Sequence, residues 1–202
     1  MARSEKFLRQ TLNLPRTSFP MRAGAVEREP PMATRLTTQV YKRHRLRCAA
    51  SQHDPAAGDV PRKRFVLHDG PPYANGSLHM GHYLNKVLKD ISNRVALMSG
   101  RDVTYVPGWD CHGLPIELKA LVAAGGNAAR GGDHEGMDPS HIRQLARACA
   151  EEAIAEQRED LVRWGVLADW SGTPGSIYRT MDPHFEAAQL GMYGSCAMDV
   201  RR

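Results

Sequence analysis

Apolar and polar positions alternate most clearly in the middle of the chain. A first apolar run, Phe65–Leu67, is followed at once by Asp69-Gly70-Pro71-Pro72, which forces a turn. From Met80 onward apolar residues recur at helical spacing, and Gly100 supplies the stop. A second apolar run follows at Val103–Val106. The order strand, glycine-bearing loop, helix, strand predicts a βαβ unit and an α/β fold with a parallel sheet.

The predicted helix has one apolar and one polar face. The apolar face, which we interpret as core, consists of Met80, Leu84, Val87, Leu88, Ile91, Val95 and Met98. The opposite side carries Lys86, Lys89, Asp90, Asn93 and Arg94.

Further elements are predicted towards the C-terminal end. Pro115–Ala124 has the pattern of a short helix with proline in its first turn, and the glycine-rich stretch 125–136 predicts an exposed loop. Asp138-Pro139 is a good N-cap and first turn for a long helix to about Trp164, whose charged residues predict a solvated face. Residues 191–202 show no helix or strand pattern.

Length and composition limit the class of protein. The chain has 202 residues, enough for one ordinary domain, with 42% hydrophobic and 24% charged residues. No apolar run approaches the length needed to cross a bilayer, so no membrane partner is expected. Residues 1–64 carry 14 Lys/Arg against 5 Asp/Glu, a net charge of +9, whereas residues 65–202 carry 13 against 17, or −4.

The basic, partly irregular N-terminal arm is compatible with three interpretations: an organellar transit peptide, a segment that binds RNA phosphates, or a solvated tail. Four prolines in this arm argue against an amphipathic targeting helix: Pro15, Pro20, Pro30 and Pro31. The candidates for phosphate contacts are Lys42, Arg43, Arg45 and Arg47. A solvated tail is favoured for residues 48–64 because of their Pro, Gly and Asp content.

The candidate chemistry lies where the first strand leads into the helix. Ligands of parallel sheets bind beyond the carboxyl ends of the strands, and a helix N-terminus there favours an anion. His79 and His82 are three residues apart, so both imidazoles share one face and can donate N–H to phosphate oxygens. Gly81 between them leaves room for a nucleotide against the backbone.

His79-Met80-Gly81-His82 resembles the His-x-Gly-His signature of class I aminoacyl-tRNA synthetases. Two flanking blocks resemble isoleucyl-tRNA synthetases of the bacterial or organellar type: Gly70-Pro71-Pro72-Tyr73-Ala74-Asn75-Gly76, and Gly108-Trp109-Asp110-Cys111-His112-Gly113-Leu114-Pro115-Ile116-Glu117. The resemblance covers most of residues 11–190, with a gap at 35–63, and corresponds to the first part of a synthetase.

The resemblance implies the first half of a Rossmann-like nucleotide-binding domain, with ATP as a substrate accompanied by Mg²⁺. Isoleucine would be activated as isoleucyl-adenylate and transferred to tRNA(Ile) by the full-length enzyme. The catalytic residues would be His79 and His82, which stabilise charge on the phosphates. ATP would be bound by Asn75, Gly76, His79, Gly81 and His82. The amino acid would be bound by Gly70, Pro71, Asp110 and His112, with the Asp110 carboxylate facing the α-ammonium group.

This resemblance divides the chain into a basic extension (1–64), half of a catalytic domain (65–190) and an unstructured or aberrant tail (191–202). The lysine-bearing second ATP signature of the family has no counterpart in this sequence. We therefore expect a fragment that is inactive alone, with uncovered apolar helix faces and poor solubility. The compartment stays open, with a mitochondrion or other organelle favoured over the cytoplasm.

Several alternatives remain at this point. The chain could be a nucleotide- or RNA-binding remnant without catalysis, or belong to a leucyl or valyl synthetase. Asp110 could cap the turn before Pro115, and His68 could be a core histidine. The four cysteines are far apart in sequence, so no metal site is expected. One rival metal-ligand set is compatible with the sequence: His79, His82, Cys111 and His112.

Overall fold

The computed structural model describes residues 7, 11, 12, 18, 20, 22–53, 62–124 and 138–199. The chain divides into two compact units, Met1–Met32 and Ala33–Arg202. The glycine-rich stretch 125–136 and most of residues 1–21 lie outside the described residues, so the expectations for them stay predictions.

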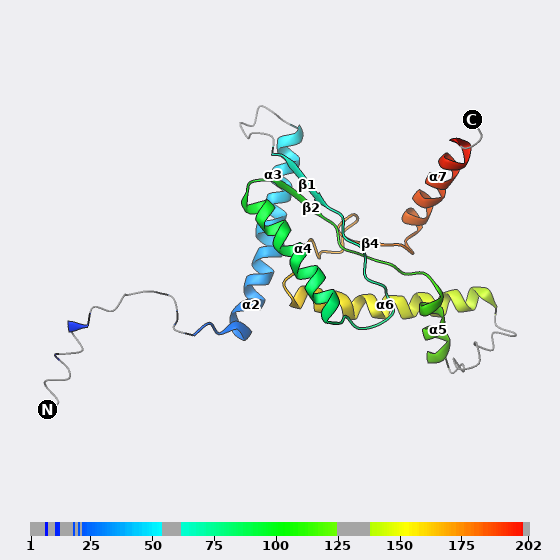
Figure 1. Cartoon of the computed structure of the whole chain (residues 1–202), viewed down its shortest axis with the longest axis horizontal. Helices are drawn as coiled ribbons and strands as arrows, with labels where there is room; N and C mark the ends of the chain where they lie inside the picture. The colour runs from blue at the N-terminus through cyan, green and yellow to red at the C-terminus, as the bar shows by residue number, and fades with distance from the viewer. Residues whose placement is uncertain are drawn as a thin grey trace. The chain divides into compact units, whose positions relative to one another are not determined.

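The predicted βαβ unit is present and confirms the α/β fold class. Strand β1 (Arg64–Leu67) pairs in parallel with β2 (Asp102–Tyr105), with Phe65 opposite Val103. Helix α4 (Met80–Met98) forms the crossover between them, and the two strands lie side by side in Figure 1. Residue Gly100 has a φ of 78°, a conformation that favours glycine, and lies in the turn that leads from the helix into β2.

A second parallel pair extends the fold. Strand β3 (Gly108–Trp109) pairs with β4 (Tyr178–Arg179) from much later in the chain. Between them lie α5 (Leu114–Ala123) and α6 (Pro139–Arg163), and α6 begins at the predicted cap, where Asp138 accepts a hydrogen bond from the N–H of Ser140 at 3.3 Å. The bounds of α5 and α6 match the sequence expectations to within a residue or two, whereas the two-residue strands β3 and β4 were not predicted.

The core gathers around Trp109, which is fully buried, between α5, α6 and the segment after α6. It includes Ile116 from α5, Ala150 and Leu161 from α6, and Ala168. The indole N–H of Trp109 donates to Gln157 Oε1 at 3.1 Å, so the polar edge of the largest core side chain is satisfied.

The final helix differs from the sequence expectation. Residues 191–202 show no recognisable pattern, yet α7 (Pro183–Asp199) continues through residue 199. The helix begins where the N–H of Phe185 donates to Asp182 O at 2.9 Å. Its residues 187–196 are exposed, so no buried face imposes a hydrophobic period on the sequence. The missing period explains why the pattern did not predict it.

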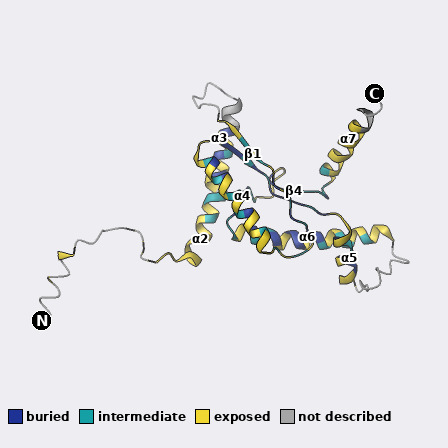
Figure 2. Cartoon of the chain, viewed as in Figure 1, coloured by how far each residue is buried: buried dark blue, intermediate teal, exposed yellow. Residues whose placement is uncertain are grey.

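The expectation that the apolar stripe of α4 is core is wrong. Six of its seven residues are mainly exposed: Met80 76%, Leu84 59%, Leu88 56%, Ile91 51%, Val95 53% and Met98 79%. The buried side of α4 instead contains Lys86, Asn93 and Ala96. Figure 2 shows buried and exposed colours alternating along this helix. Polar contacts made by Lys86 and Asp90 orient the helix. The uncovered apolar face agrees with the expected exposure of helix faces.

The later part of the N-terminal arm is helical. Helices α2 (Ala25–Thr34), η1 (Arg35–Tyr41, a π-helix) and α3 (Lys42–His53) follow one another along the chain. The expectation that Pro30 and Pro31 interrupt a helix is wrong, because both lie inside α2. The first turn of this helix is closed by Gly24 O, which accepts from the amides of Glu27 and Arg28.

Helix α3 contacts β2, in contrast to the expectation of a separate extension up to residue 64. The N–H groups of Val103 and Tyr105 donate to His44 Nε2 and Tyr41 Oη, both at 3.4 Å. Alternate N–H groups of a strand point to opposite edges, so these side chains cover the edge of β2 that faces away from β1. Within the described residues, no helix has the length and apolar character needed to cross a bilayer.

Candidate functional site

The two sequence blocks that carry the predicted site meet in the structure. Tyr73 and Asp110 form a parallel bridge. The N–H of Ala74 donates to Asp110 O at 2.8 Å, and the N–H of Asp110 donates to Pro72 O at 3.0 Å. The Tyr73 hydroxyl donates to the carbonyl of His112. The loop before α4 therefore runs alongside the residues that follow β3, where Asp110 lies half-buried.

The histidine pair forms the N-terminal cap of α4. His79 is the N-cap residue, and its Nδ1 accepts from the N–H of Gly81 at 3.0 Å. The N–H of His79 in turn donates to His82 Nδ1 at 3.3 Å, which closes a reciprocal capping box. The ring centroids are 3.9 Å apart, with the planes tilted by 42°. The shared face predicted for the two imidazoles is confirmed.

This arrangement fixes the chemistry that the two rings present. Since Nδ1 of each ring accepts a backbone N–H, each neutral ring carries its proton on Nε2 and can donate it. Partial burial, the neighbouring His79 and the charge of Lys86 lower the pKa of His82, which favours the neutral form of its ring. The first-turn amide of Gly81 is already occupied, and the Nε2–H groups of the two imidazoles are donors that this cap leaves available.

Gly81 leaves the space that the His79 ring occupies. A Cβ at Gly81 would lie 2.8 Å from Cε1 and 3.0 Å from Nδ1 of the His79 ring. Any larger residue therefore has to displace the imidazole. The structure thus gives a reason for glycine at position 81, which is its close contact with the His79 ring. The sequence analysis had given another reason, room for a nucleotide against the backbone.

The loop that leads to the histidine pair is held by two side chains. Gln157 Nε2 donates to the carbonyls of Tyr73 at 2.9 Å and Gly76 at 2.6 Å. Lys119 Nζ donates to the carbonyl of Asn75 at 2.8 Å. The predicted ATP-binding residues Asn75 and Gly76 are thus fixed through their carbonyl groups.

The start of the same loop rests on a buried ion cluster. Asp69 accepts from both Lys86 and Lys89, and Tyr105 Oη donates to it at 3.0 Å. Lys86 Nζ also lies 3.4 Å from the carbonyl of Gly70. Burial by itself raises the pKa of Asp69, but the hydrogen bonds from the two lysines outweigh it and hold that pKa below its ordinary value. Of the predicted amino-acid-binding residues in this loop, Gly70 is exposed and Pro71 half-buried.

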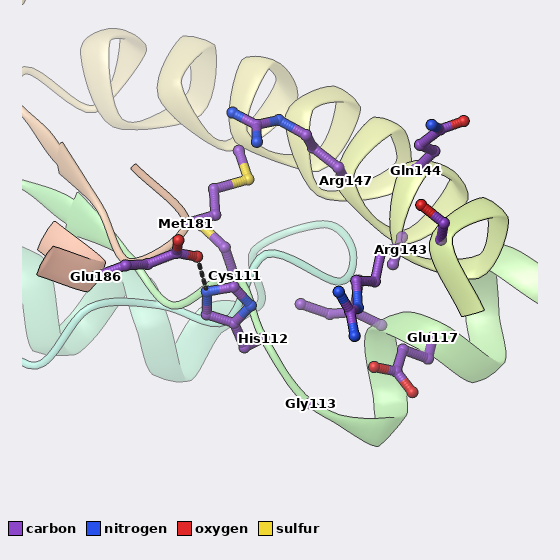
Figure 3. A pocket seen from close by; sticks show the side chains of 12 residues that line it. Cys111, His112, Gly113, Glu117, Arg143, Gln144, Arg147, Met181 and Glu186 are labelled. Carbon is purple, nitrogen blue, oxygen red and sulfur yellow. Dashed lines mark ion pairs between the residues drawn. The ribbon is translucent and has the colours of Figure 1, made fainter. Parts of the chain in front are cut away.

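A cavity of about 310 Å³ is lined in part by the residues that follow Asp110 (Figure 3). It is lined by Cys111, His112, Gly113, Ile116, Glu117, Ser140, Arg143, Gln144, Ala146, Arg147, Met181 and Glu186. His112 Nε2 lies 3.5 Å from Glu186 Oε1, the contact drawn as a dashed line. His112 is the predicted site residue that lines this cavity, whereas the histidine pair and Asp110 lie outside its lining.

The rival metal-ligand set does not come together. Cys111 is buried and its thiol donates to Trp109 O at 3.5 Å, while His112 is exposed and pairs with Glu186. His79 and His82 are engaged in the cap. Among the residues that the structure describes, these four do not form a candidate metal cluster.

Sequence reasoning missed Gln157 and Lys86. Gln157 was assigned to a helix with a solvated charged face, yet it is 2% exposed. A signal was present, because Gln157 continues the apolar row of Ala150, Ala153, Ile154 and Leu161 on α6. A polar residue on an apolar row predicts a buried hydrogen-bonding role. Lys86 carried no such signal, because it stands among other polar residues.

Comparison with known proteins places these features in a family. The family model described as tRNA synthetases class I (I, L, M and V) matches residues 50–198. The chain is 44% identical over 190 residues to the isoleucine–tRNA ligase of a Nostoc species, covering 94% of this chain and 18% of that protein. It is 46% identical over 193 residues to the same ligase of Rippkaea orientalis, covering 96% of this chain and 18% of the ligase.

A solved structure also resembles the chain, with a TM-score of 0.49 and 23% identity. It is the LeuRS of Agrobacterium radiobacter K84 in a ternary complex with tRNA and LeuAMS, and the match covers 81% of this chain and 18% of that one. The chain spans about 18% of the length of these relatives. The resemblance to isoleucyl-tRNA synthetases is confirmed by the curated relatives, and the chain belongs to the class I tRNA synthetases of the I, L, M and V group.

Proposed function

We propose that this chain forms the part of an isoleucine–tRNA ligase that holds ATP and isoleucine for amino-acid activation. The observation that supports this most directly is the pairing of Pro72–Ala74 with Asp110, which brings the amino-acid block beside the loop that enters the histidine pair. The similarity to curated ligases of this specificity favours isoleucine over leucine or valine.

The phosphates of ATP would lie against the start of α4. His79 and His82 donate from Nε2, and the dipole of a 19-residue helix adds a positive partial charge. In activation, a carboxylate oxygen of isoleucine attacks the α-phosphorus, the bond to the pyrophosphate oxygen breaks, and isoleucyl-adenylate forms. The two imidazoles stabilise the negative charge on the phosphate oxygens without accepting or giving up a proton.

Asp110 would bind the α-ammonium group of isoleucine. Its backbone is fixed on both sides by the loop, and a half-buried carboxylate makes charge-assisted hydrogen bonds to an ammonium group. Gly70 and Pro71 would shape the apolar part of this pocket.

Mg²⁺ would enter with ATP. The first turn of α4 contains no acidic residue, and Mg²⁺ prefers oxygen ligands. The residues at this helix start therefore fit the phosphates and not the ion, and Mg²⁺ would remain bound to the triphosphate. Transfer of the aminoacyl group to tRNA(Ile) is proposed for the full-length enzyme.

Calorimetric titration of the purified chain with MgATP tests the proposal. We expect saturable binding that His79→Ala weakens about tenfold, the equivalent of one hydrogen bond to a charged group. Met98→Ala at the exposed C-terminal end of the same helix is the matched control and should leave the affinity unchanged. Absence of saturable binding by a chain that circular dichroism shows to be folded contradicts the proposal.

The amino-acid half is tested separately with a non-hydrolysable isoleucyl-adenylate analogue. Asp110→Asn should weaken binding of this analogue while leaving the affinity for ATP alone unchanged, because only the analogue carries an ammonium group. Equal loss for both ligands would contradict the role proposed for Asp110.

A further inference from the structure

A cluster of three metal-ligating side chains lies apart from the candidate site, between α3 and the start of β2. His44, Cys48 and Asp102 are 9%, 5% and 3% exposed, and one ligand atom of each lies within 4.8 Å of the others. Two elements contribute to it, α3 and β2, and Cys48 and Asp102 are 54 residues apart in the sequence. Helix α3 lies against the strand pair in Figure 1.

We propose that His44, Cys48 and Asp102 bind a divalent transition-metal ion, zinc by their ligand chemistry, which fastens α3 to β2. A thiolate, an imidazole and a carboxylate are the three ligand types that zinc takes in proteins. Three protein ligands leave a fourth tetrahedral position for water. This role is structural and does not depend on the function proposed above.

The geometry is close to that of a tetrahedral site. With zinc–sulfur and zinc–nitrogen bonds of about 2.3 and 2.0 Å, the sulfur and nitrogen of a tetrahedral site lie about 3.5 Å apart. Cys48 Sγ lies 3.5 Å from His44 Nε2. His44 and Cys48 are four residues apart on one helix, the spacing that places two ligands on the same face. The Asp102 oxygen needs to approach by at most about 1.5 Å from the 4.8 Å limit.

The charges of the cluster also suit a dication. On binding, the Cys48 thiol releases its proton to solvent, and the thiolate and the carboxylate together neutralise Zn²⁺. Two cations are near: Arg62, which is exposed, and Arg45. Arg45 Nη1 makes its shorter contact with Thr104 Oγ1 at 2.5 Å and lies 3.5 Å from Asp102 Oδ1. It can therefore remain an outer partner that orients the carboxylate.

The alternative is a cluster held by hydrogen bonds alone. His44 Nε2 accepts from the N–H of Val103 at 3.4 Å, a long contact that metal binding would replace. Metal content separates the two cases directly.

The experiment uses the full 202-residue chain without a polyhistidine tag, expressed with added zinc and dialysed against metal-free buffer. Elemental analysis should find about one zinc per chain. After replacement by Co²⁺, the chain should show the sulfur-to-cobalt charge-transfer band of a thiolate ligand and the intense visible bands of tetrahedral cobalt.

Cys48→Ser should abolish the charge-transfer band and lower the metal affinity more than about 100-fold, because loss of outer-sphere partners alone costs 10–100-fold. Asp102→Asn, which keeps the shape of the side chain, should also lose metal, and it provides a second test if Cys48→Ser fails to fold. Cys196→Ser on the exposed face of α7 is the matched control and should retain one zinc.

Any of three results would overturn the proposal. One is a folded wild-type chain with less than about 0.1 zinc and no cobalt spectrum after loading. Another is full zinc content in both Cys48→Ser and Asp102→Asn. Loss of metal in Cys111→Ser but not in Cys48→Ser would also overturn it, by assigning the ion to the other cysteine.

Discussion

The ammonium group of Lys86 lies directly against the carboxylate of Asp69, and the two side chains are only 5% and 3% exposed. Asp69 follows strand β1, and Lys86 lies two turns into α4. The pair therefore fixes the direction in which α4 leaves the loop, and with it the position of His79 at the start of the helix. A buried charge pair orients this helix, while its apolar stripe faces outward.

Lys86→Met is expected to lower the free energy of unfolding by about 3 kcal/mol, because removal of one partner leaves a buried charge undercompensated. Because Lys89 still contacts Asp69 in this variant, we expect a loss at the lower end of the range of about 3–5 kcal/mol that is typical for breaking a buried ion pair. Urea unfolding followed by circular dichroism measures it. Lys42→Met at an exposed position of α3 is the control. A loss of unfolding free energy below about 1 kcal/mol for Lys86→Met would contradict the prediction, because that is the value of an ordinary surface ion pair.

The same pair predicts sensitivity to acid. The folded-state pKa of Asp69 lies below its ordinary value of 3.8, so its stabilisation is complete above that value and is lost as the pH falls through the folded pKa. The stability difference between wild type and Asp69→Asn should therefore shrink only below pH 3.8. Urea titrations at a series of pH values test this. A difference that already shrinks near neutral pH would assign the effect to another group.

Gly81→Ala should separate binding from stability. The new Cβ displaces the His79 ring, so we expect about tenfold weaker MgATP binding, the value of one hydrogen bond to a charged group. Alanine is the better helix former by about 1 kcal/mol, which offsets the loss of the His79 cap, so the thermal midpoint should change little. Gly194→Ala in α7 has no atom within 4 Å of its new Cβ and should leave MgATP affinity unchanged.

Gln157→Met should loosen the loop before the histidine pair. The change leaves the carbonyls of Tyr73 and Gly76 and the indole N–H of Trp109 without their partner, at a cost of about 2–4 kcal/mol. Hydrogen exchange should become faster at Ala74, whose amide bonds to Asp110. Gln144→Met at an exposed position of the same helix is the control. Unchanged exchange at Ala74 would show that the loop is held by other contacts.

The exposed apolar face of α4 predicts self-association. Leu88→Lys and Ile91→Lys should lower the apparent mass in light scattering at high concentration and change the free energy of unfolding by less than about 0.5 kcal/mol. Leu161→Lys, at a position 2% exposed in the core, should instead unfold the chain. A large loss of stability in Leu88→Lys would mean that this face is packed in solution.

Local signals predicted most of the elements but not their orientation. Neighbouring residues determine the cap at Asp138, the glycine stop after α4 and the strands β1 and β2. These features could therefore be predicted from the sequence. The burial of α4 depends on Asp69 and on Leu167, whose N–H donates to Asp90 at 2.8 Å. Those partners are 17 and 77 residues away, and helical periodicity carries no information about them.

The candidate site divides in the same way. Sequence alone predicted the histidine pair, Gly81 and Asp110 as site residues, because that prediction needs only their spacing and their flanking residues. Only the tertiary structure showed that both imidazoles use Nδ1 within the cap, that Gln157 holds the loop, and that His44 and Cys48 meet Asp102. Residue order specifies local conformation and chemical type, whereas the direction of a lone pair or the closure of a cluster depends on atoms brought together from distant segments.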